Sequence, residues 1–181
     1  MADHIKDCEK FLARLEGAQL TFSGEKSAFG QSDVLVIGHL CRPYRRKPSP
    51  AKVEAISAMK EECKSVTEVW RFLGACTFYH IWIPHYAHIA EPLYGLLKKG
   101  CKFEWIREHV ESVQKLKEAL MTASTLKKAV YERDIPVYVM VDTSPTRIGW
   151  VINQVDAGGT RFPMRFGAKV LSECKSNVRK Q

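Results

Sequence analysis

Hydrophobic residues recur at helical spacing in three long stretches of the chain. The first covers residues 5–15 and is followed by Gly17, a residue type that commonly ends a helix. The second begins with SVTE at Ser65, a capping box in which the serine and glutamate side chains each bond the other's backbone N–H. The third covers residues 106–122, with charges between the apolar positions. We therefore predict three amphipathic helices, the second ending before Pro84.

Two shorter helices are predicted between these stretches. One follows Ser49, which is a suitable N-cap, and has Pro50 at its first position. The other opens near Ala90 and runs to Gly100, because Pro92 is best tolerated in a first turn.

Other segments follow the patterns of strands and turns. Short apolar, β-rich runs around two glycines predict a small β-hairpin over residues 20–41. The sequence RPYRRKPSP (residues 42–50) holds three prolines and predicts a hinge or linker. VYVMVD, IGWVINQ and TRFPMRFGAK predict three strands separated by turns at TSPTR and DAGG, and residues 171–181 are typical of a helix start. These elements predict an α+β protein.

Composition narrows the class further. The chain has 181 residues, of which 45% are hydrophobic, enough to build a core. Because no apolar run approaches the roughly 18–20 residues that cross a bilayer, and the start has no signal-peptide layout, we expect an intracellular protein of the cytoplasm or nucleus with no membrane contact. The six cysteines lack metal-finger spacing, so we interpret them as reduced, mostly buried thiols rather than zinc ligands. We expect surface or capping roles for five of the histidines: His39, His80, His85, His88 and His109.

Positive charge is concentrated in one part of the sequence. The net charge is +8, and residues 34–53 contain no acid. The basic side chains in this segment are Arg42, Arg45, Arg46, Lys47 and Lys52. The pattern fits a patch that contacts phosphates, although a solvated loop has the same composition.

Five stretches carry a resemblance to a known family. They are VLVIGHLCRPYRRKPSPAKVEAI upstream, SVTEVWRFLGACTFYHIWIPHYAHIAEPLYGLLKKGCKFEW in the middle, and LKEALMTASTL, VMVDTSPTRIGW and RFGAKVLSE downstream. In this order they resemble gypsy-type long-terminal-repeat retrotransposon reverse transcriptases, and they are most similar to those of fungal elements. The resemblance implies the end of the palm over residues 1–42, with a helix and a primer-grip-like hairpin, and a helical thumb over residues 43–100. Residues 101–181 then form a truncated ribonuclease-H-like domain, a three-stranded antiparallel sheet with a flanking helix.

The resemblance also implies which residues contact nucleic acid. The family's primer grip matches Gly38 and His39, and the thumb helix that follows the minor groove matches Trp70, Gly74, Thr77 and Phe78. We add Arg45, Arg46 and Lys47 as phosphate contacts. Tryptophan at position 70 and the sequence PYRR depart from the family, so phosphate contact at 70 and the form of that turn stay open. The residues alone favour a plain turn glycine at Gly38 and a core position for an aromatic stripe such as that ending at Phe78.

A lone carboxylate ends the first predicted strand of the last part. By resemblance, Asp142 matches the first catalytic, metal-binding carboxylate of ribonuclease H, an enzyme that holds two Mg²⁺ ions roughly 4 Å apart with several carboxylates. The second would come from residues 172–181, but Glu173 lies ahead of its expected place. No Asp-Asp pair, the mark of the polymerase centre, occurs in the chain. We expect an incomplete metal site and no cofactor for this chain, with Mg²⁺ serving the intact family enzyme.

These observations predict a fragment of a retrotransposon polyprotein. It would bind RNA/DNA or DNA duplexes weakly, in a salt-sensitive and sequence-independent way, with no small-molecule substrate and no catalysis on its own. Whether it acts as part of an enzyme stays open. The alternative is a degenerate or host-recruited protein-interaction domain that uses the exposed edge of the unfinished sheet.

Overall fold

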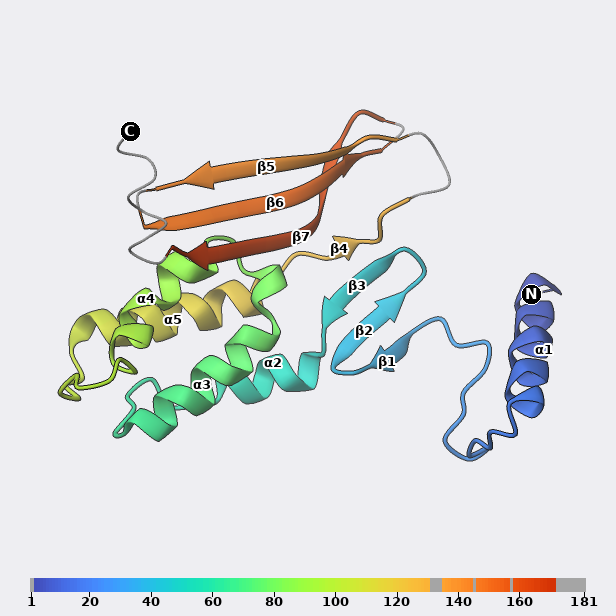
Figure 1. Ribbon diagram of the computed structural model, residues 1–181, viewed down its shortest axis with the longest axis horizontal. Coiled ribbons are helices and arrows are strands. Elements are labelled where there is room, and N and C mark those ends of the chain that lie inside the picture. The colour runs from blue at the N-terminus through green and yellow to red at the C-terminus, as the bar shows by residue number, and fades with distance from the viewer. Residues whose placement is uncertain (1, 131–134, 145, 157, 172–181) are drawn as a thin grey trace. The chain divides into compact units, whose positions relative to one another are not determined.

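The helices and strands follow the predicted α+β order. The computed structural model describes residues 2–130, 135–144, 146–156 and 158–171. The helices are α1 (Ala2–Gly17), α2 (Pro50–Ser57), α3 (Val66–Phe78), the 3-10 helix η1 (His80–Trp82), α4 (Tyr86–Gly95) and α5 (Arg107–Met121). The strands are β1 (Val34–Val36), β2 (His39–Arg42), β3 (Arg45–Pro48), β4 (Leu126–Lys127), β5 (Val137–Thr143), β6 (Arg147–Val155) and β7 (Arg161–Val170) (Figure 1).

The chain divides into two units, Met1–Val34 and Leu35–Gln181. The first unit contains α1, whose apolar residues Ile5 and Phe11 are exposed. The predicted helix is confirmed here. The predicted hairpin over residues 20–41 is wrong for residues 20–33, which form no strand, because serine, glycine and charged residues interrupt the alternation that a strand needs.

The hairpin lies further along the chain and continues into residues that we predicted to be a linker. The two sheets have the strand orders β1-β2-β3-β4 and β5-β6-β7. The linker prediction for residues 42–50 is wrong because its prolines occupy positions that need no N–H donor. Pro43 lies in the two-residue turn between β2 and β3, and Pro48 ends β3 opposite His39. Tyr44 supplies the positive φ of 62° that closes this turn without glycine.

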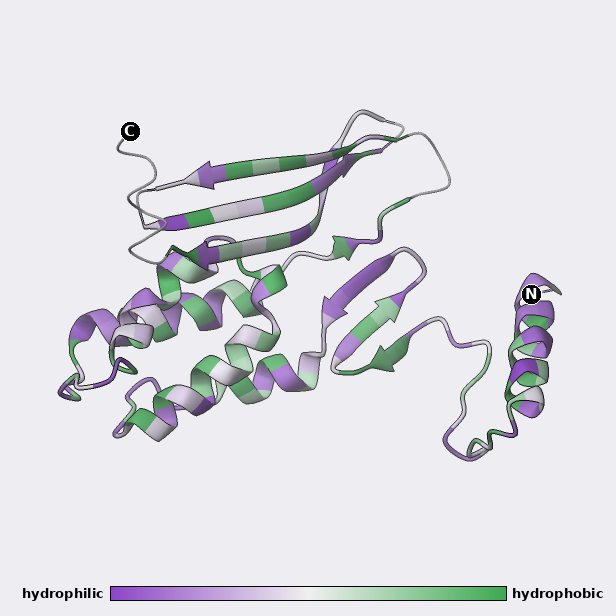
Figure 2. Ribbon diagram, in the orientation of Figure 1, coloured by the Kyte–Doolittle hydropathy of each residue, from purple (hydrophilic) through white to green (hydrophobic). Residues whose placement is uncertain are grey.

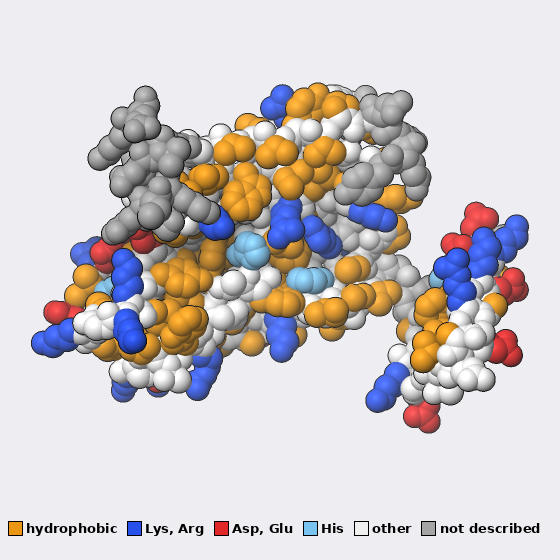
Figure 3. All heavy atoms as spheres, in the orientation of Figure 1, with side chains coloured by type: hydrophobic (Ala, Val, Ile, Leu, Met, Phe, Trp, Pro, Cys, Tyr) orange, Lys and Arg blue, Asp and Glu red, His pale blue; other side chains and the backbone are white. Residues whose placement is uncertain are grey.

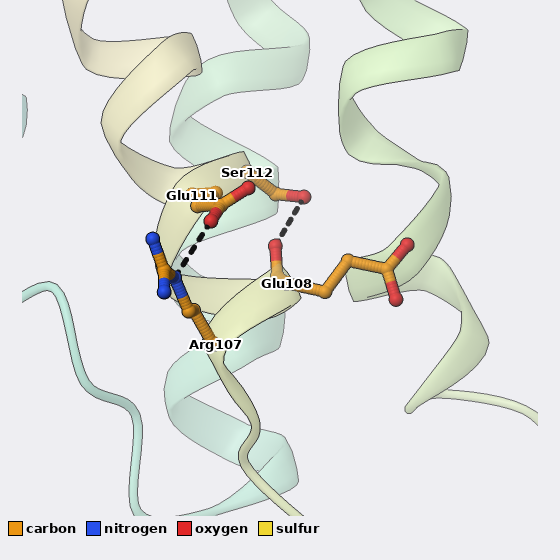
Figure 4. A network of polar contacts seen from close by, with 4 residues as sticks. All are labelled: Arg107, Glu108, Glu111 and Ser112. Atoms are coloured by element: carbon orange, nitrogen blue, oxygen red, sulfur yellow. Dashed lines mark hydrogen bonds and ion pairs between the residues drawn. The ribbon is translucent and has the colours of Figure 1, made fainter.

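The three long helices predicted from periodicity are confirmed. Helix α3 begins after Ser65, whose side chain accepts a hydrogen bond from the backbone N–H of Glu68 at 3.3 Å. The Glu68 carboxylate accepts from the N–H of Lys64 at 2.7 Å, one residue earlier than the predicted partner. Helix α5 begins at Arg107, which donates to Glu111 at 3.0 Å, and one turn is further fixed where Ser112 donates to the Glu108 carbonyl at 3.0 Å (Figure 4).

The short helix predicted near Ala90 begins earlier, at Tyr86, and holds Pro92 in its interior. Pro92 removes a backbone donor from the helix. Four buried residues of α4 pack into the core and supply the tertiary stabilisation that offsets this loss: Tyr86, Ala87, Ala90 and Leu93. The α2 prediction holds, with Pro50 at its first position, although no capping bond from the Ser49 side chain is formed among the described residues.

The three predicted strands form an antiparallel sheet in the predicted order. Seven residue pairs join β5 to β6, from Val137–Gln154 to Thr143–Ile148. In the β6–β7 ladder, Trp150 lies opposite Gly167, and a Cβ on Gly167 would lie 2.2 Å from the Trp150 ring. The glycine therefore makes room for the indole. Figure 2 contrasts β3, which is hydrophilic along its length, with the mixed strands of this sheet.

The hydrophobic core lies among α2, α3, α4 and α5 and includes Leu126 of β4. Phe166 of β7 packs against it, and α4 and η1 contact β7 (Figure 1). The division at residues 42 and 100 remains a prediction. No helix in the described part of the chain is long and apolar enough to cross a membrane.

The cysteines are less buried than predicted. The five described cysteines are free thiols, and only Cys63 and Cys76 are buried, whereas Cys101 is exposed. Burial raises the pKa of Cys76 to about 12, so this thiol stays protonated. Cys174 and Glu173 lie outside the described residues, as do residues 172–181 of the helix start predicted over residues 171–181.

Candidate nucleic-acid interface

The turn between β1 and β2 has an unusual backbone. Ile37 and Gly38 both have positive φ, of 45° and 74°. Glycine adopts this conformation freely, but for a β-branched residue it is strained. The Ile37 side chain is 80% exposed, so contacts within the protein do little to compensate. Strain of this kind gathers at functional sites.

Gly38 is needed at this turn for two reasons. Besides its positive φ, a Cβ at this position would lie 3.1 Å from the Tyr79 hydroxyl and 3.3 Å from the Phe78 ring. The Gly38 carbonyl accepts hydrogen bonds from the Tyr79 hydroxyl at 3.0 Å and from the Ser49 N–H at 2.9 Å. The turn is therefore held against the C-terminal end of α3.

His39 joins the turn to α3 through its ring. Its imidazole stacks on Phe78 with centroids 5.0 Å apart and an interplanar angle of 10°, and it lies 5.0 Å from the Trp82 ring. Burial, followed by the charge of Arg46, lowers the pKa of His39. Its buried Nδ1 has no hydrogen-bond partner among the described residues. His39 is thus a packed aromatic residue, which differs from the predicted surface or capping role.

Two of the other histidines lie at the starts of helices. His109 has a capping role, since its Nδ1 accepts from the Ile106 N–H at 3.1 Å. His85 precedes α4 at the N-cap position with a positive φ of 55° and makes no side-chain capping bond within the described residues.

One side of α3 is open to solvent. We call the residues Trp70, Gly74, Thr77 and Phe78 the α3 flank. Trp70 is 57% exposed and Phe78 is 46% exposed, and Gly74 and Thr77 are exposed as well. The flank is therefore surface and not core, and the buried stripe of α3 is a separate set: Val69, Phe72, Leu73 and Cys76.

Gly74 has open space above it. A Cβ built on this residue meets no described atom within 4 Å. Glycine in a helix interior costs about 1 kcal/mol relative to alanine. Because internal packing does not require this glycine, its small size leaves the helix backbone accessible from outside.

The three predicted phosphate contacts of β3 have different environments. Arg45 and Lys47 are exposed, whereas Arg46 is half-buried between them, as the alternation of a strand dictates. The Arg46 guanidinium donates to the Met164 carbonyl at 3.2 Å and lies 5.9 Å from the Trp82 ring centroid. Arg46 therefore has internal partners, while Arg45 and Lys47 offer their charges to solvent.

A groove next to the flank contains residues that the sequence did not single out. It measures about 530 Å³ and lies between the β1–β2 turn, α2 and α3. Its walls include Ile37 and Phe78, with Lys52 and Arg71 as the basic residues. Lys52 was noted only as part of the basic stretch. Ile37 lies in the primer-grip-like hairpin, but its left-handed backbone was not predicted, because propensity gives no signal for a β-branched residue in such a turn.

The structure joins some predicted site residues and leaves others apart. The turn residues Gly38 and His39 contact Phe78, so the hairpin and the α3 flank form one continuous site. Asp142 lies elsewhere, on β5, exposed and opposite Gly149. It lines a small pocket of about 220 Å³ together with His85, His88 and Arg147.

The described residues around Asp142 do not form a metal centre. Among the described residues, no group of three His, Cys, Asp or Glu side chains is placed to hold a metal ion. Arg147 forms an ion pair with Glu91 and contacts His88, so its positively charged guanidinium already lies beside the pocket. A single carboxylate does not fit two Mg²⁺ ions, and we assign no chemistry to it.

Comparison with known proteins first finds a similarity in the C-terminal part. Residues 105–181 match the family model of the RNase H-like domain found in reverse transcriptase. The match covers α5 and the sheet β5-β6-β7, the region in which the three strands were predicted.

Particular relatives then extend the similarity over nearly the whole chain. The chain is 28% identical over 178 residues to the retrovirus-related Pol polyprotein from transposon 297 of Drosophila melanogaster and 30% identical over 179 residues to the Gag-Pol polyprotein of woolly monkey sarcoma virus. It is 23% identical over 176 residues to the transposon Tf2-3 polyprotein of Schizosaccharomyces pombe. These alignments cover 97–98% of the chain but only 10–16% of each relative. The chain thus spans only a short part of the length of the retroviral and retrotransposon Pol polyproteins that it resembles.

Solved structures support the fold. Compared with the foamy viral protease-reverse transcriptase in complex with RNA/DNA hybrid, the chain has a TM-score of 0.76 and a sequence identity of 23%. The match covers 97% of this chain and 24% of that one. The same viral protein in complex with double-stranded DNA gives a TM-score of 0.76 and 22% identity, over 96% of this chain and 36% of that one. The fold is therefore similar to that of a segment of this protein.

Proposed function

We propose that the chain binds nucleic-acid duplexes through the α3 flank and the β1–β2 turn. The observation that carries this proposal is the open space above Gly74 in the middle of an exposed helical side. A glycine there weakens the helix and serves no internal contact, but it allows a polynucleotide backbone to approach closely. Trp70 and Phe78 flank it with exposed rings that pack against sugars or stack.

The charge distribution supports phosphate contacts around this surface. Arg45 and Lys47 on β3 and Lys52 on α2 are exposed, and Arg71 lines the adjoining groove. With three or four phosphate contacts, affinity falls about 40- to 150-fold between 50 and 200 mM salt, because the log–log slope is about −0.9 per contact on B-form DNA. These contacts make binding weak at physiological salt, and they carry no sequence information themselves. Arg46 adds less than its neighbours, since its guanidinium already has partners.

The relatives suggest what this binding serves. The foamy viral proteins that share the fold were captured with double-stranded DNA and with RNA/DNA hybrid. By analogy, the parent protein of this chain grips a template–primer duplex during RNA-directed DNA synthesis. Our narrower assignment is a gypsy-type element of fungal origin. The similarity to a Schizosaccharomyces pombe transposon supports that origin, and the Drosophila and viral relatives show that the similarity extends beyond fungi.

The decisive experiment titrates a labelled RNA/DNA hybrid at two salt concentrations with the wild-type chain and Gly74→Glu. The new carboxylate projects into the open space and repels phosphates, so we expect binding at least tenfold weaker with the fold intact by circular dichroism. The control Lys115→Gln also lowers net charge by one, at an exposed position of α5, and should bind nearly as the wild type. Equal affinity for the wild type and Gly74→Glu would remove the α3 flank from the interface.

A second candidate function, protein interaction, is favoured by β5. All seven residues of this edge strand are exposed, and five consecutive ones are large and apolar (Val137–Val141). Figure 3 shows hydrophobic side chains gathered on the surface over β5 and β6. An unprotected edge of this kind pairs readily with another strand. Recovery of the chain as a monomer that binds duplex, with no change in its state at high concentration, would argue against this candidate.

A further inference from the structure

Three hydroxyl groups meet where the α3 flank adjoins α4. The Thr77 oxygen lies 2.7 Å from the Tyr86 hydroxyl and 3.2 Å from the Tyr94 hydroxyl, and the two tyrosine hydroxyls are 3.3 Å apart. Each oxygen is thus within hydrogen-bond distance of both others. Thr77 is exposed on α3, whereas Tyr86 and Tyr94 come from α4, which packs against α3.

Counting protons shows what this hydroxyl ring presents to solvent. A hydroxyl has one proton to donate and two lone pairs to accept. Tyr86 is only 6% exposed, and burial raises its pKa, so it stays protonated and must donate within the ring. When the three groups donate in one direction around the ring, all three protons are used and each oxygen keeps one free lone pair. In this arrangement Thr77, the exposed member, faces outward as an acceptor.

An outward acceptor distinguishes between duplexes in the minor groove. There, A·T pairs of DNA present acceptors only, and the guanine N2 amino group is the single base donor. A ribose strand adds 2′-hydroxyls, which donate as well as accept. We propose that the Thr77–Tyr86–Tyr94 ring selects duplexes that offer a hydrogen-bond donor to Thr77, with Tyr86 and Tyr94 as positioning residues. This inference rests on the proposed function, since it places the α3 flank at the minor groove.

Three duplexes of one sequence separate the two donor sources. The first is an RNA/DNA hybrid with inosine in place of guanine, which offers only 2′-hydroxyls. The second is DNA with guanine, which offers only the amino group, and the third is DNA with inosine, which offers neither. We expect the third to bind about three- to tenfold more weakly than at least one of the others, the change that one net hydrogen bond of about 0.7–1.4 kcal/mol produces.

Variants of the ring distinguish this preference from the general shape of a hybrid. Thr77→Val removes the acceptor and should abolish the preference. Tyr94→Phe leaves only two hydroxyls, so one proton is freed to point outward, and we expect the preference to shrink while binding to inosine DNA is kept or rises. Tyr138→Phe removes a hydroxyl from β5 and should bind as the wild type.

The outcomes separate this inference from the proposed function. Equal binding of all three duplexes by the wild type, or a preference that survives in Thr77→Val, would overturn the hydroxyl-ring assignment and leave duplex binding intact. No binding to any duplex at low salt would overturn the proposed function and the inference with it.

Discussion

The strained turn at Ile37 leads to a prediction in which stability and binding change in opposite directions. A left-handed conformation costs an L-residue about 1–2 kcal/mol, and asparagine tolerates it far better than a β-branched side chain. Ile37 is 80% exposed, so only about one fifth of its surface is buried. Since full burial of an isoleucine side chain stabilises by about 2–3 kcal/mol, its replacement loses about 0.5 kcal/mol of hydrophobic stabilisation. Ile37→Asn should therefore raise the free energy of unfolding by about 1 kcal/mol.

Two measurements check this prediction. In urea unfolding, Ile37→Asn should have a higher free energy of unfolding than the wild type, and its midpoint of thermal unfolding should be about 2–4 °C higher for a chain of this size. Titration with the RNA/DNA hybrid should show binding about three- to tenfold weaker, because an apolar contact at the tip of the turn is lost. The control is Val139→Asn, in which an exposed β-branched residue with extended backbone is replaced, and it should gain no stability and keep its affinity.

Either result alone has a clear meaning. A stability of Ile37→Asn at or below that of the wild type would show that the turn stores no strain. Unchanged affinity would show that the tip of the turn does not touch the duplex.

Three further predictions follow from features of the second unit. Gly167→Ala should lower the free energy of unfolding by about 1–3 kcal/mol, because its Cβ would lie 2.2 Å from the Trp150 ring, and a wild-type stability in urea would contradict this. Because the pKa of His39 is lowered in the folded state, the unfolded chain binds the proton more readily. Stability should therefore be present above the ordinary pKa of about 6.5 and fall as the pH drops below it. His39→Gln should flatten this fall in urea titrations between pH 7 and 5, although His109, whose pKa is also lowered, keeps part of the slope; an unchanged slope would rule out His39. Val139→Lys places a charge on the exposed edge of β5 and should reduce self-association in light scattering at high concentration, and equal association would mean that β5 is not the adhesive edge.

Sequence patterns succeed where one period runs through a whole element. The spacing of apolar residues in α3 and α5 and the alternation in β5, β6 and β7 decide these elements locally. The spacing of Trp70, Gly74 and Phe78 likewise placed them on one side of α3, and the structure shows that side to be exposed.

The failures come from pairings between distant segments. Strand β3 was missed because its prolines suggest a linker. It is a strand because it pairs with β2 and β4, and β4 has only two residues, too few to show a strand periodicity in the sequence. The pairing of Thr77 with Tyr86 and Tyr94 depends on how α4 packs on α3, and no local pattern encodes it.

The pairing of β3 with β4 has a practical consequence for dissecting the molecule. Arg46 lies opposite Leu126, and Leu126 is fully buried in the same cluster as residues of α3 and α4. A cut near residue 100 would remove that leucine and the whole of α5 from the piece carrying the hairpin, and expose apolar surface on both halves. Recombinant work on the duplex-binding surface should therefore keep the whole second unit, residues 35–181, in one piece.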